Sequence, residues 1–250
     1  MNLSTFELPY EKYLLKGDSY SSGAAENNTI VLHGAGKSSR ATFARLREYL
    51  CLHGISSASF DFVGHGETGG SIQETTLQGR TDQAAAVIKH TCQEPLNLIA
   101  ASMAGYSAIK LTELFTVENL VLLVPAVYTP HACDILFGPD FSAIIREPNS
   151  WVNSDAFGII SEFNGSVTII AAEFDDVIPK MVIEQLYASA RNAEKRTLHI
   201  VPNSSHLSLF PQEKDFLEVM DLLLNVLKKS KLPARCNELM GSSKRVGKDQ

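Results

Sequence analysis

The sequence predicts an α/β fold, in which a mostly parallel central sheet carries helices on both faces. Short runs of apolar and β-branched residues alternate with longer segments of helical periodicity along the chain. The short runs are almost continuously apolar, which is typical of strands buried on both faces of a parallel sheet. At 250 residues, with 44% hydrophobic and 20% charged side chains, the chain is large and apolar enough for a substantial core.

Each element of this fold has its own signal in the sequence. Ser71 and Glu74 have the spacing of a capping box, which predicts the start of the second helix. The last helix has an apolar stripe, including Phe216, Met220 and Leu223, that is wide enough to be buried. The predicted strands are Thr29–His33, Ser57–Phe62, Leu96–Ala101, Leu120–Pro125, Val167–Phe174 and Thr197–Val201. The predicted helices are Thr42–His53, Thr75–His90, Ala104–Phe115, Pro179–Ala190 and Asp215–Lys229.

Two segments depart from this alternation. Residues 1–28 contain the short alternating runs Phe6–Leu8 and Tyr13–Leu15, which indicate an antiparallel edge of the sheet. Residues 126–165 are rich in proline, glycine and aromatic side chains, and the interval is too long for a plain loop. We therefore expect residues 126–165 to form a small cap inserted between two strands.

Charge divides the chain into an acidic body and a basic tail. The net charge is −6, but residues 228–250 hold seven basic and two acidic side chains, a net +5, which leaves −11 for residues 1–227. An acidic body argues against binding of nucleic acid. We expect one domain over residues 1–230 and a solvated tail over residues 231–250, which frays or serves as an interaction arm.

The same composition predicts a cytoplasmic protein without a membrane span. The N-terminal segment carries charged residues where a signal peptide needs an apolar run. The longest apolar stretch, Leu120–Val127, is too short to cross a bilayer. The four cysteines show no close pairing, which favours free thiols in a reducing compartment. No histidine spacing indicates a metal site, and we expect no cofactor.

The strongest chemical signal surrounds Ser102. A predicted buried strand leads into Ser102, which is flanked by Ala100 and Ala104 and followed by a predicted helix. A sharp strand-to-helix turn needs small neighbours, and it lifts the serine hydroxyl above the edge of the sheet. At the helix N-terminus the Met103 backbone N–H can face a developing oxyanion. Taken alone, Ser102 is interpreted equally well as a simple helix cap.

This run resembles the nucleophile elbow of the α/β-hydrolase family, usually written G-x-S-x-G, with alanine in both glycine positions. Two further motifs of that family are similar to segments of this chain. His33-Gly34-Ala35-Gly36 resembles the H-G-x-G loop, in which the Ala35 N–H would be the second oxyanion donor. Asp61–Gly66 resembles the D-x-x-G-x-G turn, whose role is structural, so the resemblance assigns no catalysis to His65.

A serine nucleophile needs a base, and the base needs an orienting carboxylate. The family order of serine, acid and histidine fits Asp175 after the strand Val167–Phe174 and His206 after the strand Thr197–Val201. Asp175 is favoured over Asp176 because the family's acid loop, aligned on Pro179, places the acid at Asp175.

The resemblance covers about residues 28–228 and implies acyl transfer by a serine hydrolase. Ser102 would attack a carbonyl, His206 would take its proton, Asp175 would hold the His206 tautomer, and the Ala35 and Met103 N–H groups would stabilise the oxyanion. The chain looks most like the small-capped esterases of the family, including the cinnamoyl and feruloyl esterases and the monoacylglycerol lipases.

This interpretation leaves the substrate open. A carboxylic ester of small-molecule size is favoured, with Phe137, Phe141 and Trp151 of the insertion as a wall of its pocket or, alternatively, as the core of the cap. A thioesterase, peptidase or C–C hydrolase would use the same triad. A catalytically silent binding protein and a lyase on the same fold are the alternatives from other classes. The sequence does not indicate an oligomeric state.

Overall fold

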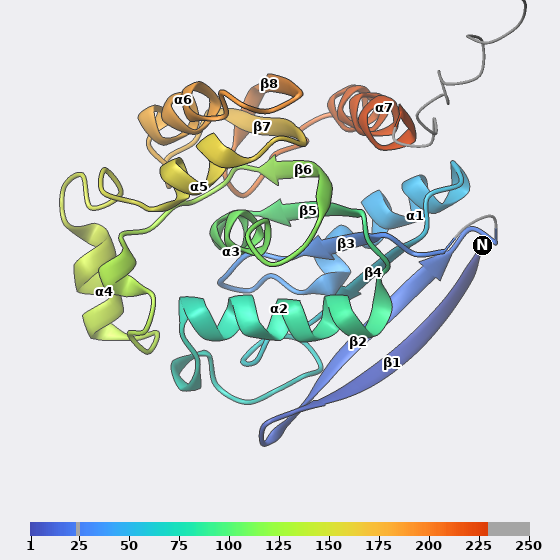
Figure 1. The fold of residues 1–250 in the computed structure, drawn as a ribbon, viewed down its shortest axis with the longest axis horizontal. Coiled ribbons are helices and arrows are strands. Elements are labelled where there is room, and N and C mark those ends of the chain that lie inside the picture. The colour runs from blue at the N-terminus through green and yellow to red at the C-terminus, as the bar shows by residue number, and fades with distance from the viewer. Residues whose placement is uncertain (24–25, 230–250) are drawn as a thin grey trace, which may run out of the picture.

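The computed structural model describes residues 1–23 and 26–229. The predicted tail, residues 231–250, lies outside the described residues. A twisted sheet runs through the middle of the molecule, with helices on both sides (Figure 1). The predicted fold class, a mostly parallel central sheet with helices on both faces, is confirmed.

Within the described residues the sheet has eight strands in the order β1-β2-β4-β3-β5-β6-β7-β8. Strand β2 is antiparallel to its neighbours β1 and β4, and all other neighbouring strands are parallel. The parallel strands therefore end at one edge, where the loops that follow them meet. The strands are β1 Asn2–Tyr10, β2 Tyr13–Ser21, β3 Thr29–Leu32, β4 Ser57–Phe60, β5 Leu96–Ala101, β6 Val117–Leu123, β7 Ser166–Phe174 and β8 Lys195–Ser205.

Helices cover both faces of the sheet because its central strands are apolar on both sides. The adjacent β3 residues Ile30 and Val31 are both fully buried, and they belong to separate apolar clusters on opposite faces. Helices α1 and α7 pack on the Val31 face, and α2, α3, α5 and α6 pack on the Ile30 face. The helices are α1 Ala44–Leu52, α2 Leu77–Thr91, α3 Met103–Leu111, α4 Pro139–Arg146, α5 Ala156–Glu162, α6 Lys180–Ser189 and α7 Glu213–Lys229.

The N-terminal segment forms the expected antiparallel edge. Strands β1 and β2 form a long hairpin, and β2 joins the sheet through β4. The capping box of Ser71 and Glu74 has a different place from the predicted one. It caps the short 3₁₀ helix Ile72–Glu74, and Thr76 is the N-cap of α2, with its hydroxyl accepting from the Gly79 N–H at 2.9 Å. The predicted helix start was wrong because the separate 3₁₀ helix Ile72–Glu74 precedes α2.

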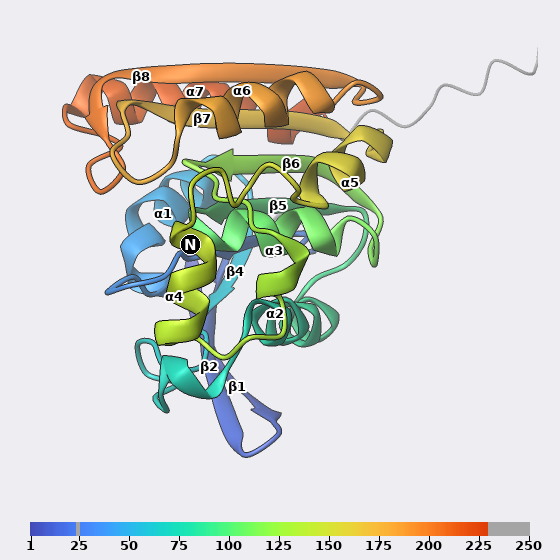
Figure 2. The same ribbon diagram turned by 90° about the vertical axis from the view of Figure 1, so that its left-hand side faces the viewer.

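The segment between β6 and β7 lies beyond the ends of the parallel strands. Its helix α4 stands past the arrowheads of β5 and β6 in Figure 1 and faces the viewer in Figure 2. The segment is tied to α3, because the Tyr106 hydroxyl donates to Asp155 at 2.8 Å and Lys110 forms an ion pair with Asp155 at 3.0 Å. Among the described residues, no helix is both long enough and apolar enough to cross a membrane.

Candidate active site

Ser102 occupies the sharp turn between β5 and α3. Its backbone has φ 51° and ψ −120°, a conformation that a non-glycine residue adopts at a cost of the order of 1–3 kcal/mol. The turn is held from both sides, because the Ser102 N–H donates to the Leu123 carbonyl at 2.9 Å and its carbonyl accepts from the Ala126 N–H at 3.0 Å. The flanking Ala100 and Ala104 are fully buried, so larger side chains would not fit.

Ser102, His206 and Asp175 form a continuous hydrogen-bonded chain. Ser102 Oγ lies 3.0 Å from His206 Nε2, and His206 Nδ1 lies 2.9 Å from Asp175 Oδ2. A carboxylate only accepts, so Nδ1 carries the proton and Nε2 accepts from the serine hydroxyl. The three side chains come from the loops after β5, β7 and β8, which end at the same edge of the sheet.

The structure distinguishes Asp175 from its neighbour Asp176. The second oxygen of Asp175 accepts hydrogen bonds from the N–H groups of Val177 at 2.9 Å and Ile178 at 2.8 Å. Burial raises the pKa of Asp175, but hydrogen bonds from His206, Ile178 and Val177 outweigh it and hold the pKa below its ordinary value. Asp176 is exposed to solvent. Asp175 is therefore an ionised carboxylate in contact with the histidine.

The two residues predicted to supply oxyanion donors, Ala35 and Met103, both lie beside Ser102. Met103 is the first residue of α3, where an N–H has no acceptor inside the helix. Ala35 follows Gly34, and a Cβ on Gly34 would lie 3.1 Å from the Ser102 Cβ, so this loop passes directly beside the nucleophile. Ala35 and Met103 thus flank Ser102 from the loop after β3 and from the start of α3.

The two histidines of the neighbouring motifs are buried and serve the loops. His33 Nδ1 donates to the Gly34 carbonyl at 2.8 Å, and its Nε2 accepts from the Phe62 N–H at 3.2 Å. His65 is also buried, and its ring centroid lies 4.9 Å from that of His33. Burial lowers the pKa of both imidazoles, and the charge of Arg80 lowers both further. Both rings are therefore neutral structural parts of the site.

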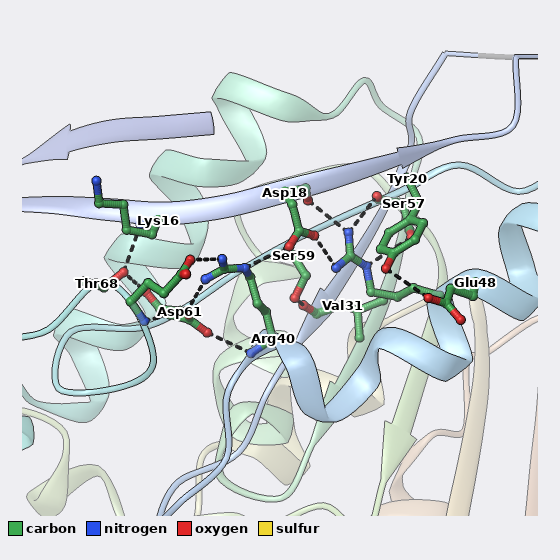
Figure 3. A network of polar contacts seen from close by, with 12 residues as sticks. Lys16, Asp18, Tyr20, Val31, Arg40, Glu48, Ser57, Ser59, Asp61 and Thr68 are labelled. Carbon is green, nitrogen blue, oxygen red and sulfur yellow. Dashed lines mark hydrogen bonds and ion pairs between the residues drawn. The ribbon is translucent and has the colours of Figure 1, made fainter. Parts of the chain in front are cut away.

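Asp61 belongs to the polar network drawn in Figure 3. Its carboxylate accepts from the Arg40 N–H at 2.8 Å and from the Glu67 N–H at 2.9 Å, and it pairs with the Arg40 side chain. Arg40 also pairs with Asp18 of β2 at 2.8 Å. A Cβ on Gly66 would lie 2.2 Å from the Asp61 carboxylate, which explains a glycine at that position. The network fixes the end of the loop that contains Ala35.

The three aromatic residues proposed as a pocket wall are buried. Phe137 and Phe141 pack edge to face with ring centroids 4.7 Å apart, and Trp151 packs against Phe157. Phe137 is 5%, Phe141 3% and Trp151 9% exposed, within the main apolar core. The structure shows these three side chains packed in the core. Their contact with a substrate stays a prediction.

Two cavities differ in their relation to this site. The larger, about 570 Å³, lies between α3, β6 and α5 and has no triad residue in its lining. The second, about 410 Å³, lies between β7, β8 and α6 and includes Asp175 in its wall, next to apolar side chains such as Ile178 and Ile200. Neither Ser102 nor His206 lies in the wall of either cavity, so of the triad only the carboxylate borders the second one.

Comparison with known proteins agrees with the fold. A family described as serine aminopeptidase, S33, matches residues 23–152, which is more than half of the chain. The chain belongs to this family. It is therefore a member of the α/β-hydrolase superfamily, as the sequence motifs indicated. No curated protein sequence matches the chain.

Solved structures of other proteins share the fold over nearly the whole chain. Est1E from Butyrivibrio proteoclasticus, solved with ferulic acid, has 17% identity and a TM-score of 0.69, and the match covers 89% of this chain and 99% of that one. The monoacylglycerol lipase of Paleococcus ferrophilus has 16% identity and a TM-score of 0.66 over 86% and 98% of the two chains. A thioesterase domain from the curacin biosynthetic pathway has 12% identity and a TM-score of 0.64 over 90% and 100%.

One residue beside the candidate active site was missed by the sequence interpretation. Arg80 on α2 is fully buried and contacts the loop that contains Ala35. A signal for it exists in the sequence, because Arg80 lies at helical spacing from Leu77, Ala84 and Val87 on the apolar face of the predicted helix. A charged side chain is rarely buried without a partner, so an arginine in that position indicates a specific polar contact in the interior.

Proposed function

We propose that this protein is a serine hydrolase that cleaves carboxylic esters through an acyl-enzyme. The observation that carries the proposal is the unbroken chain from Ser102 Oγ through His206 to Asp175, with contacts of 3.0 and 2.9 Å. A nucleophile, a base and an orienting carboxylate in this order are what acyl transfer requires.

The first half-reaction follows from the protonation states. His206 Nε2 accepts the hydroxyl proton as Ser102 Oγ attacks the carbonyl carbon, and Asp175 stabilises the imidazolium that forms. The carbonyl oxygen becomes an oxyanion between the N–H groups of Ala35 and Met103. His206 then gives its proton to the leaving alcohol, and the acyl group stays on Ser102.

Water completes the second half-reaction by the same route. His206 removes a proton from water, which attacks the acyl carbonyl, and the carboxylic acid leaves as Ser102 regains its proton. The strained turn at Ser102 keeps the hydroxyl above the sheet edge throughout.

Apolar side chains next to the acid and the base support a neutral, apolar substrate. Phe174 is 61%, Val177 56% and Leu207 93% exposed, and each lies within two residues of Asp175 or His206 in the chain. The acidic body, with a net charge of −11 over residues 1–227, also disfavours strongly anionic substrates. A small, uncharged ester is the substrate class that fits both features.

The test combines a fluorophosphonate probe with hydrolysis of a short p-nitrophenyl ester. Wild-type protein should be labelled and should turn over the ester, and Ser102→Ala and His206→Ala should do neither. Wild-type protein that neither reacts with the probe nor hydrolyses the ester would favour a silent binding protein. Matched thioester and amino-acid p-nitroanilide substrates of the same acyl group identify the preferred leaving group.

A further inference from the structure

Arg80 is a buried cation without an anionic partner among the described residues. It lies on α2 with no exposed surface, and its guanidinium stacks 3.8 Å above the ring of Phe62. Its Nε and Nη1 groups donate no hydrogen bond within the described part of the chain. A buried charge in this state opposes folding, so its presence calls for a functional reason.

The contacts that Arg80 does make are to the loop beside the nucleophile. Its Nη2 donates to the carbonyls of His33 at 2.9 Å and of Gly34 at 3.1 Å. The Gly34 carbonyl also accepts from His33 Nδ1 at 2.8 Å. Two donors, Arg80 on α2 and the neighbouring His33, therefore fix the direction of this one carbonyl.

Because the peptide is planar, the contact of Arg80 with the Gly34 carbonyl also sets the direction of the Ala35 N–H. In a trans peptide the C=O of one residue and the N–H of the next point in opposite directions. Because the Gly34 carbonyl points to Arg80, the Ala35 N–H points away from Arg80. The Gly34 α-carbon lies against the Ser102 side of the loop, where an added Cβ would be 3.1 Å from the Ser102 Cβ.

The other end of the loop is fixed independently. The Arg40 N–H donates to Asp61 at 2.8 Å, and the Arg40 side chain pairs with Asp18 and Asp61 (Figure 3). The segment from His33 to Arg40 is thus held at its start by Arg80 and at its end by Asp61. The Ala35 N–H is preorganised between these two points, and preorganised donors are the ones that lower a barrier.

We propose that Arg80 is a positioning residue of the oxyanion hole, which orients the Ala35 N–H and places a buried positive charge behind the developing oxyanion. This inference rests on the proposed function of Ser102. In the resting protein the guanidinium faces only carbonyl dipoles, whereas the tetrahedral intermediate puts a full negative charge on the far side of the Gly34–Ala35 peptide. Burial lowers the pKa of Arg80 to about 9, which leaves it charged at neutral pH.

The decisive variants are Arg80→Met and Arg80→Lys, with Arg47→Met as the matched control. Arg47 is a second buried arginine, on α1; it binds Asp18 and the Ser57 carbonyl, and it is linked to the loop of Ala35 only indirectly, through the pair of Asp18 with Arg40. Active sites are counted with the fluorophosphonate, and kcat, KM and the melting temperature are measured. A trifluoromethyl ketone is the probe of the oxyanion, because attack by Ser102 converts it to a tetrahedral alkoxide while His206 takes the proton.

Arg80→Met should lower kcat on the order of 10- to 100-fold with KM within about twofold, since outright loss of an oxyanion donor costs about 100- to 1,000-fold. Trifluoromethyl ketone affinity should fall in parallel. Arg80→Lys keeps the positive charge but lacks the planar guanidinium, so its kcat should lie between those of Arg80→Met and wild type. Arg47→Met should lower the melting temperature and reduce kcat per active site much less than Arg80→Met does, because it makes no contact with the His33 or Gly34 carbonyl.

The outcomes separate this inference from the proposed function. Unchanged kcat and ketone affinity in Arg80→Met overturn the role of Arg80, and so does a pattern identical to that of Arg47→Met. If Arg80→Met does not fold, full kcat and ketone affinity in Arg80→Lys overturn the positioning role, and a partial loss of kcat at constant KM supports it. Failure of the proposed function is recognised separately, because Ser102→Ala would then match wild type.

Discussion

Gly34 and Ser102 are in such close contact that a Cβ on Gly34 would lie 3.1 Å from the Ser102 Cβ and 3.3 Å from the Ala101 carbonyl oxygen. Neither neighbour moves easily, because Ser102 is held in a strained turn and Ala101 ends a buried strand. The loop of Ala35 can therefore approach the nucleophile only with glycine at position 34.

Gly34→Ala should therefore lower ester turnover more than stability. The added methyl group displaces the loop by a few tenths of an ångström and moves the Ala35 N–H away from the oxyanion. We expect kcat to fall on the order of 10-fold or more, since small displacements of preorganised groups cost up to about 100-fold. Steady-state kinetics on a p-nitrophenyl ester measure this loss.

Gly158→Ala is the control for this substitution. Gly158 lies within α5, and an added Cβ there meets no atom within 4 Å. Alanine should raise helix stability by about 0.5–1 kcal/mol and leave kcat unchanged. Equal kcat in Gly34→Ala and wild type would contradict the close approach as a functional requirement.

The two neighbouring aspartates should respond very differently to amidation. Asp175→Asn removes the acceptor that fixes the His206 tautomer, and a comparable change in serine proteases costs about 10,000-fold in kcat. Asp176→Asn changes an exposed side chain and should leave kcat within about twofold. The two variants are compared by turnover per fluorophosphonate-reactive site, and a larger loss in Asp176→Asn would show that the acid is misassigned.

Stability should fall in mildly acidic solution because His33 and His65 are buried in neutral form. Burial, with Arg80 as a second cause, lowers the pKa of both below the ordinary value of 6.5. The unfolded chain then binds more protons than the folded one below about pH 6.5, so the free energy of unfolding decreases as pH falls. The slope is at most about 1.4 kcal/mol per pH unit for each histidine, the limit for a difference of one bound proton.

Denaturant unfolding between pH 7 and 5 measures this slope. His65→Gln removes one of the two buried imidazoles, so the variant should lose less stability than wild type over the same interval. An identical pH dependence in the two proteins would show that the pKa of His65 is the same in the folded and the unfolded chain.

The sequence predicted the central sheet well because its strands are continuous apolar runs. Strand β5 has the predicted bounds Leu96–Ala101, and β7 differs by one residue. Strand β6 begins at Val117, three residues before the predicted start, because Asn119 continues the strand as a buried side chain that donates to Asn97 at 2.8 Å. A polar ladder inside a sheet is invisible to an analysis of apolar runs.

The candidate site was predictable where short motifs carry the chemistry, and unpredictable where a contact joins distant elements. Ser102, Asp175 and His206 follow strands in the expected order, and the structure brings them together. Arg80 was missed because its role depends on the carbonyls of His33 and Gly34, 47 and 46 residues away in the chain. Apolar periodicity assigns such a position to the core without showing what the charge contacts.

The aromatic residues of the segment between β6 and β7 allow the packing role and the substrate role to be separated. Phe141 is 3% exposed and contacts the rings of Phe137 and Tyr128, at 4.7 and 5.9 Å between centroids. Phe141→Ala should lower the free energy of unfolding by about 3–5 kcal/mol, as expected for loss of a buried phenylalanine. Val152→Ala, at a 46% exposed position of the same segment, should change it by less than about 0.5 kcal/mol.

Substrate contact by Phe141 adds a second, independent effect. If the ring also forms a wall of the pocket, KM for aromatic and long-chain esters rises in Phe141→Ala while KM for an acetyl ester stays constant, because only the larger acyl groups reach the ring. Denaturant unfolding and an acyl-chain series on the same preparations separate the two effects. A uniform change in KM across the series would leave Phe141 with the packing role alone.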